Sequence, residues 1–190
     1  PGLIEMDAYI GMGHTAENLA KKYSISRDEQ EKMALESHQK ASEAQENGEF
    51  KDEIITINEI DTDGCIRSET SLESMAKLKP AFDKKGVVTA GTSSPLTDGA
   101  AAVIVCSEKY AKDNNLEIMA YIRGMAISGC NPEIMGIGPV ISSQKALKRA
   151  GINLGDIDII EMNEAFAAQS LACVKELGID MSKLNIHGGA

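Results

Sequence analysis

The second half of the chain alternates short apolar runs with helical patterns, and this alternation is the feature that most constrains the fold. The predicted strands are 100–106, 119–128 and 157–162, and the predicted helices are 108–114, 140–150 and 164–177. Gly151 and Gly178 stand just after two of these helices, where a glycine commonly ends a helix in the left-handed conformation. Strands alternating with helices form sheets layered against helices. We therefore predict an α/β protein with layered mixed sheets and helices.

The chain before Val87 has a different texture and predicts an accessory, loop-rich layer. Thr15 is expected to cap a first helix, and Ser26 with Glu29 forms a capping box for a second. The second helix is alanine-rich and highly charged, so we expect it to cover other elements rather than to form a deep core. Isoleucines within 54–60 predict a strand, and a short helix is expected over 71–78.

Charge and composition exclude several classes of partner. The formal net charge of −10 argues against nucleic acids and against anionic membrane surfaces. No apolar run approaches the ~20 residues of a membrane-spanning helix, and the first residues lack the pattern of a signal peptide. We therefore expect a cytoplasmic protein with no nucleic acid and no membrane partner.

The four cysteines lack CxxC or Cys/His metal spacing, so the sequence predicts free thiols and no metal site. Cys106, at the end of an apolar run, and Cys173, within the last helical pattern, are expected to be buried structural thiols.

The stretch 157–168 carries the first candidate functional residue. A predicted strand ends at Asn163 and a helix follows at once. Ligands in α/β proteins gather beyond the carboxyl ends of strands, and a side-chain amide there can fix a water molecule or an oxyanion. The alternative is that Asn163 simply caps the helix, and spacing alone favours capping.

The stretch 89–102 is dominated by small and hydroxylated residues and leads into an apolar run. Such a loop allows a ligand to lie close to the backbone and to hydrogen bond with Ser93 or Ser94. The alternative is a plain surface turn nucleated by Pro95 and by Asp98-Gly99. Neither stretch names a function by itself.

Taken together, several segments resemble the motifs of the thiolase family in order and spacing. They are Asn-Glu-Ala-Phe at 163–166, Ser-Ser-Pro-Leu-Thr-Asp-Gly-Ala-Ala-Ala at 93–102, Met-Gly-His-Thr-Ala-Glu-Asn at 12–18, and the segments 74–82, 135–139 and 185–190. The resemblance covers nearly the whole chain and implies part of a thiolase-like fold. By this resemblance 1–96 is an accessory, CoA-binding loop domain. Residues 97–115 are the last strand and helix of the N-terminal half, and 116–190 begin the C-terminal half.

The resemblance implies an acetyl-CoA C-acyltransferase that cleaves 3-ketoacyl-CoA or condenses acetyl-CoA through an acyl-cysteine, in a ping-pong mechanism. Coenzyme A thioesters are then substrates, no cofactor is permanently bound, and the intact enzyme is a homodimer or homotetramer. The family's nucleophilic cysteine, catalytic histidine and second cysteine are not in this sequence. We therefore expect the 190-residue chain alone to be inactive.

Carried over residue by residue, the resemblance makes Asn163 the catalytic asparagine that holds the water of the enolate oxyanion hole. Ala165 and Phe166 match positions that line the pantetheine and acyl channel. Ser94 matches a serine that hydrogen bonds to the pantetheine amide, and Leu96 lies on the same loop.

The remaining matches are at the two ends of the substrate. Met12 matches a methionine near the reacting acyl group, whereas Arg67 and Ser74 are candidates for the nucleotide end of coenzyme A. Two alternatives stay open: a non-catalytic, thiolase-like subunit that binds coenzyme A or a partner, and another enzyme of the wider superfamily such as a ketosynthase or a hydroxymethylglutaryl-CoA synthase. The 163–166 motif in this context speaks against the second.

Overall fold

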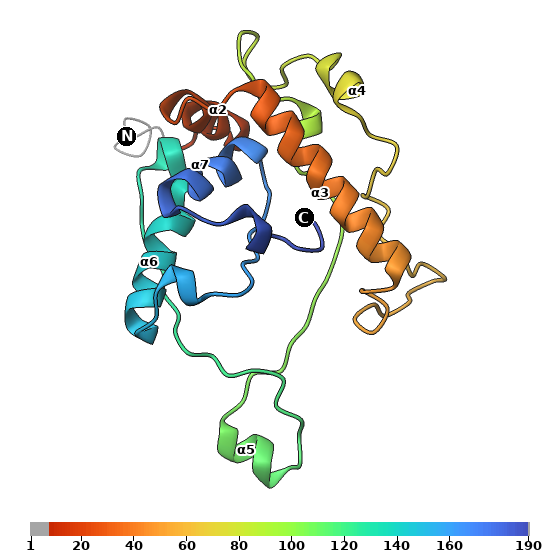
Figure 1. Cartoon of the computed structure of the whole chain (residues 1–190), viewed down its shortest axis with the longest axis vertical. Helices are drawn as coiled ribbons and strands as arrows, with labels where there is room; N and C mark the ends of the chain where they lie inside the picture. Colours follow the sequence, from red (N-terminus) through yellow and green to blue (C-terminus); the bar gives the residue numbers. More distant parts are fainter. Residues whose placement is uncertain (1–7, 190) are drawn as a thin grey trace.

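Helices and turns dominate the computed structural model of the chain, which describes residues 8–189 (Figure 1). The α-helices are α2 (Met12–Lys22), α3 (Arg27–Asn47), α4 (Leu72–Ala76), α5 (Glu108–Asp113), α6 (Gly138–Ala150) and α7 (Ala167–Leu177). Short 3₁₀ turns are η1 (Ala90–Thr92), η2 (Pro132–Ile137), η3 (Leu154–Asp156) and η4 (Met181–Lys183). Within the described residues, no helix has the length and apolar content needed to cross a membrane.

The predicted helix ends are mostly confirmed because they depend on local chemistry. The capping box of α3 is present, since the Ser26 hydroxyl accepts from the Glu29 N–H and the Glu29 carboxylate accepts from the Ser26 N–H. Gly48, Gly151 and Gly178 each end a helix with a positive φ, between 70° and 77°. Such a backbone conformation carries little strain only for glycine.

Two predicted caps are wrong. Helix α2 already begins at Met12, so Thr15 lies inside it and its hydroxyl donates to the Met12 carbonyl at 2.6 Å. Helix α7 begins at Ala167 with Phe166 as the N-cap, so Asn163 does not cap it. The residues before α7 stay extended because they pair with a distant loop, through an isolated bridge between Ser93 and Phe166.

The apolar runs predicted as strands join no regular sheet in the described part of the chain, and the prediction of a strand over 54–60 is wrong because the chain turns at Asn58 and Glu59, both with positive φ. Isolated bridges join Ile57 to Ile60, Pro80 to Thr89, Ser93 to Phe166 and Ile160 to Leu184. A strand is stabilised by a neighbouring strand. The runs 100–106 and 119–128 form no bridge with another segment among the described residues, and most of their side chains are exposed. They lead to α5, which stands away from the other helices (Figure 1). The prediction that Cys106 is buried is wrong, because the thiol lies on this exposed arm.

The core lies where α2 and α7 pack together beside η2 (Figure 1). Leu19, Val88 and Cys173 are fully buried in it, and burial raises the pKa of the Cys173 thiol to about 11. The prediction of a buried structural thiol at Cys173 is therefore confirmed. The Glu17 carboxylate accepts from the N–H groups of Val87 and Val88, each at 3.0 Å. Because α7 is anchored in this core, the 163–166 segment that leads into it has a fixed place.

Candidate functional site

The two stretches singled out in the sequence lie side by side. Ser93 forms a bridge with Phe166, and the Ser94 N–H donates to the Ala165 carbonyl at 3.0 Å. This contact joins residues far apart in the sequence. It places the candidate pantetheine-binding serine beside the segment that carries Asn163.

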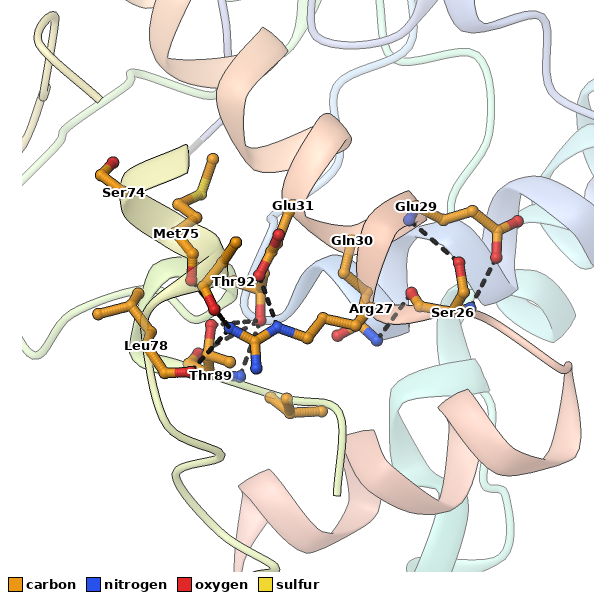
Figure 2. A network of polar contacts seen from close by, with 12 residues as sticks. Ser26, Arg27, Glu29, Gln30, Glu31, Ser74, Met75, Leu78, Thr89 and Thr92 are labelled. Atoms are coloured by element: carbon orange, nitrogen blue, oxygen red, sulfur yellow. Dashed lines mark hydrogen bonds and ion pairs between the residues drawn. The ribbon is translucent and has the colours of Figure 1, made fainter. Parts of the chain in front are cut away.

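The loop that leads to Ser94 is built on a compact turn. The Thr89 N–H donates to the Thr92 hydroxyl at 3.0 Å, and the Ser93 hydroxyl donates to the Thr89 carbonyl at 2.7 Å. Thr89 and Thr92 are buried, and Figure 2 shows them beneath the start of α3. Internal hydrogen bonds therefore fix the conformation of this loop before any ligand binds.

An arginine at the start of α3 holds α4 and the residues just after it in place (Figure 2). The Arg27 guanidinium donates to the carbonyls of Met75 and Leu78 at 2.8 and 2.7 Å, and to the Glu31 carboxylate at 2.6 Å. Ser74, within α4, is occupied in a capping box with Ser71. Ser74 is exposed and is not among the residues that line the two pockets described next.

Two adjoining pockets lie along α3. The first has a volume of ≈ 110 Å³ and lies between α3 and the Ser93–Ser94 loop. The second has a volume of ≈ 300 Å³ and contains Asn163 and His187. Both are lined by Ala41, Asp63, Ile66 and Gly189. Because they share these walls, a long ligand could contact the Ser94 loop and Asn163 together.

Asn163 is exposed and lies on the wall of the second pocket, beside Glu161 and Met162. His187 lines the same pocket and packs edge-on against Phe50, with ring centroids 6.0 Å apart. An asparagine amide can both donate and accept hydrogen bonds, so Asn163 can bind a water molecule that in turn donates to a ligand oxygen. The geometry is compatible with the oxyanion role predicted for this residue.

Arg67 follows Ile66, which lines both pockets, but does not itself line either of them. Its side chain is exposed, and its backbone N–H donates to Nδ1 of His38 on α3 at 3.3 Å. Burial lowers the pKa of His38, and the positive charge of Arg67 lowers it further. The neutral imidazole therefore ties the 63–67 loop to α3. An exposed guanidinium can bind an anionic ligand group.

Phe166 is connected through an aromatic contact to the first turn of α2, which carries Met12. A Cβ at Gly13 would lie 2.1–2.3 Å from ring atoms of Phe82, so that ring packs directly on the first turn of α2. The Phe82 ring meets Phe166 edge-on, with centroids 5.8 Å apart. Met12 is half-exposed on the same turn, whereas Leu96 is fully exposed.

The structure thus brings Ser94, Ala165, Phe166 and Asn163 together, with Arg67 next in sequence to the pocket residue Ile66. Analysis of the sequence missed Glu164, which lines the first pocket, and Asn185, which hydrogen bonds to it at 2.7 Å. The only signal in the sequence is weak, because asparagine is enriched in the left-handed conformation but seldom adopts it. Among residues 8–189 no cluster of histidine, cysteine or carboxylate side chains could hold a metal ion.

Comparison with known proteins finds thiolases along nearly the whole chain. Residues 1–109 match the thiolase N-terminal domain, and residues 116–190 match the thiolase C-terminal domain. The chain is 50% identical to a 3-ketoacyl-CoA thiolase from Vibrio parahaemolyticus over 94% of its length and 49% of the relative's. It is 48% identical to an acetyl-CoA acetyltransferase from Chromobacterium violaceum over 97% of its length and 50% of the relative's.

Solved structures agree. The crystal structure of human mitochondrial 3-ketoacyl-CoA thiolase in complex with CoA superposes with a TM-score of 0.92 at 48% identity, covering 94% of this chain and 46% of that one. The Bacillus anthracis acetyl-CoA acetyltransferase gives a TM-score of 0.89 at 44% identity, covering 95% of this chain and 48% of that one. The predicted thiolase-like fold is confirmed, and the chain spans about half the length of the curated relatives that it matches. On these matches, the chain belongs to the thiolase family.

Proposed function

We propose that the whole protein is an acetyl-CoA C-acyltransferase, which cleaves 3-ketoacyl-CoA by thiolysis or condenses acetyl-CoA in the reverse direction. The observation that carries this proposal is the pairing of the Ser93–Ser94 loop with the Ala165–Phe166 segment, at 3.0 Å between the Ser94 nitrogen and the Ala165 oxygen. It brings the serine that resembles a pantetheine ligand next to the segment that carries the candidate oxyanion asparagine.

In this proposal the substrate lies along the two pockets beneath α3. Ser94 hydrogen bonds to the pantetheine amide, and Ala165 and Phe166 bound the channel beside it. Arg67, next in sequence to the pocket residue Ile66, faces the nucleotide end, and Met12 lies toward the acyl end. Coenzyme A thioesters enter and leave as substrates, so no resident cofactor is required.

Asn163 supplies the electrostatic part of the chemistry. Removal of an α-proton from acetyl-CoA places negative charge on the thioester oxygen, and a pre-positioned donor stabilises that charge most in the transition state. A water molecule held by the Asn163 amide is such a donor. A cysteine thiolate takes the acyl group, which divides the condensation into two easier steps. None of the four cysteines in this sequence falls on a catalytic motif, and the nucleophile belongs to the remainder of the family's length.

Two further properties belong to the proposal. The negative net charge of −10 fits a protein that works in the cytoplasm and avoids nucleic acid. By analogy with its family, the whole protein works as a homodimer or homotetramer in fatty acid metabolism.

The test is the change of Asn163 to alanine in the longest natural polypeptide that carries this sequence. Loss of one oxyanion donor lowers kcat by about 10²–10³-fold, and the KM for coenzyme A changes little because Ser94 is untouched. Acetoacetyl-CoA thiolysis, followed by loss of the enolate absorbance, gives both constants. The matched control is Asn115→Ala, on the exposed arm beyond α5.

A parent protein that binds coenzyme A without turning over acetoacetyl-CoA would overturn the proposal and favour a non-catalytic subunit. Full activity of the Asn163 variant would overturn the role given to that side chain.

A further inference from the structure

Asn185 is a buried polar residue in an unusual backbone conformation. Its side chain is only 2% exposed and its φ is 44°. A non-glycine residue in the left-handed region carries strain, although asparagine tolerates it better than most residues. A buried amide must also satisfy its donors and acceptors. Asn185 therefore occupies a position that the surrounding contacts determine closely.

Apart from a turn hydrogen bond from the Gly188 N–H to its carbonyl, these contacts go to the segment that carries Asn163. The backbone N–H of Asn185 donates to the Ile160 carbonyl at 2.9 Å. Its side-chain Oδ1 accepts from the Met162 N–H at 2.8 Å, and its Nδ2 donates to the Met162 carbonyl at 2.9 Å. The side-chain amide thus bonds to Met162 as a neighbouring strand would, in a region where regular strand pairing is missing from the described residues.

The same side chain also holds the residue on the other side of Asn163. Nδ2 of Asn185 donates to Oε1 of Glu164 at 2.7 Å. The Glu164 carboxylate is confined further by Gly189, where a Cβ would lie 2.0–2.5 Å from the carboxylate atoms. One amide therefore fixes the residue before Asn163 and the residue after it.

Asn163 has little other support beyond a long hydrogen bond from the Ser170 hydroxyl to its carbonyl, at 3.5 Å. It is exposed on the pocket wall, and helix α7 begins only at Ala167. The next fixed point along the chain is Ala165, whose carbonyl accepts from the Ser94 N–H at 3.0 Å. The direction in which Asn163 points thus depends on the residues that hold its two neighbours.

We propose that Asn185 is a positioning residue, which sets the orientation of the Asn163 amide through Met162 and Glu164. This inference rests on the proposed thiolase function. A misplacement of about 1 Å at a reacting centre can lower a rate about 100-fold, so the effect falls on the step that uses Asn163.

The experiment changes Asn185 to aspartate in the longest natural polypeptide that carries this sequence. Aspartate still accepts from the Met162 N–H, but it donates to neither Met162 nor Glu164 and sets a second carboxylate against the Glu164 carboxylate. Repulsion between like charges is strong where water is excluded. The double variant Asn185→Asp with Glu164→Gln reverses the side-chain hydrogen bond, because the glutamine amide donates to the aspartate.

Two half-reactions separate a positioning role from a general structural one. Exchange of acetyl-CoA methyl protons with deuterated solvent requires the enolate and therefore the Asn163 site. Exchange of labelled coenzyme A with acetyl-CoA requires only acyl transfer to the nucleophile. We expect Asn185→Asp to slow the first about 100-fold and the second less than about threefold. The double variant should regain at least about tenfold in the first.

The control is Asn115→Asp, a second asparagine with a positive φ, of 53°, in an exposed site near α5. It should leave both half-reactions at the parent rate. Equal slowing of both half-reactions by Asn185→Asp, with no recovery in the double variant, would overturn the inference, as would a proton-exchange rate equal to the parent's. A parent protein that catalyses neither half-reaction would instead overturn the proposed function, and this inference with it.

Discussion

The turn that closes both pockets gives a sharp test of the packing, through the single change Gly188→Ala. Gly188 has a φ of +83°, and a Cβ there would lie 2.6 Å from the Ser37 carbonyl oxygen and 2.7 Å from the Ala41 Cβ. These contacts are with backbone and with a rigid methyl group, so no flexible side chain can move away. The chain must shift if the methyl group is to fit.

The expected magnitude has two parts. An L-residue in the left-handed region carries strain of about 1–2 kcal/mol. Overpacking against fixed neighbours adds about 1–3 kcal/mol. Gly151, at the end of α6, shares the positive φ, at +70°, but a Cβ there meets nothing within 4 Å. Gly151→Ala therefore contains the strain without the clash and is the matched control.

Urea unfolding followed by circular dichroism gives the free energies of unfolding of the two variants, provided that the dependence of the free energy on urea concentration has the same slope in both. Gly188→Ala should lower the unfolding free energy by about 1–3 kcal/mol more than Gly151→Ala does. It should also weaken coenzyme A binding, because the 187–189 turn lines both pockets. Equal losses in the two variants would refute the reasoning, since they would mean that α3 and the turn are not in contact at this point.

Three other predictions follow from the described contacts. Arg27→Ala leaves the buried Glu31 carboxylate without its cation and should lower the unfolding free energy by about 3 kcal/mol. The exposed control Lys77→Ala should change it by no more than ~0.5 kcal/mol. Equal urea midpoints for the two variants would contradict this. Burial lowers the pKa of His38, so the hydrogen bond from the Arg67 N–H is complete above the ordinary histidine pKa of about 6.5 and is lost as the pH falls through the lower folded-state pKa. Between these two pKa values the parent should lose stability more steeply than His38→Gln as the pH falls; parallel profiles over that range would contradict this. Burial raises the pKa of the Cys173 thiol to about 11. Iodoacetamide at neutral pH should therefore modify the exposed Cys106 and leave Cys173 unmodified until the protein unfolds, as measured by peptide mass spectrometry. Equal rates of modification of the two thiols would contradict this.

The parts of the fold that the sequence predicted well depend on neighbours close in the chain. The start of α3 follows from Ser26 and Glu29, and the ends of α3, α6 and α7 follow from glycines with positive φ. The predicted strands failed for the opposite reason. A run such as 100–106 has the composition of a strand, but the partner that completes a strand is distant and composition does not reveal it.

The same distinction applies to the candidate site. Asn163 and Ser94 were found through motifs, but their proximity depends on the hydrogen bond from the Ser94 N–H to the Ala165 carbonyl, which joins residues distant in the chain. Capping was the favoured interpretation of Asn163 from spacing alone, and it is wrong because that pairing keeps 163–166 extended. Asn185 was missed because its role depends on burial and on partners in another segment.

The composition of α3 explains how one helix can form the wall of both pockets. The expectation that it covers other elements agrees with its contacts, which reach α4, η1 and α7. Where the turn at Gly188 crosses it, α3 presents Ala41 and Ser37, and the Ser37 hydroxyl accepts from the Gly189 N–H at 3.0 Å. Large apolar side chains here would bury more surface but would hold the turn away from the helix. Small residues on this face thus permit the close approach that places Gly189 against Glu164, and through Glu164 they help to fix the segment that carries Asn163.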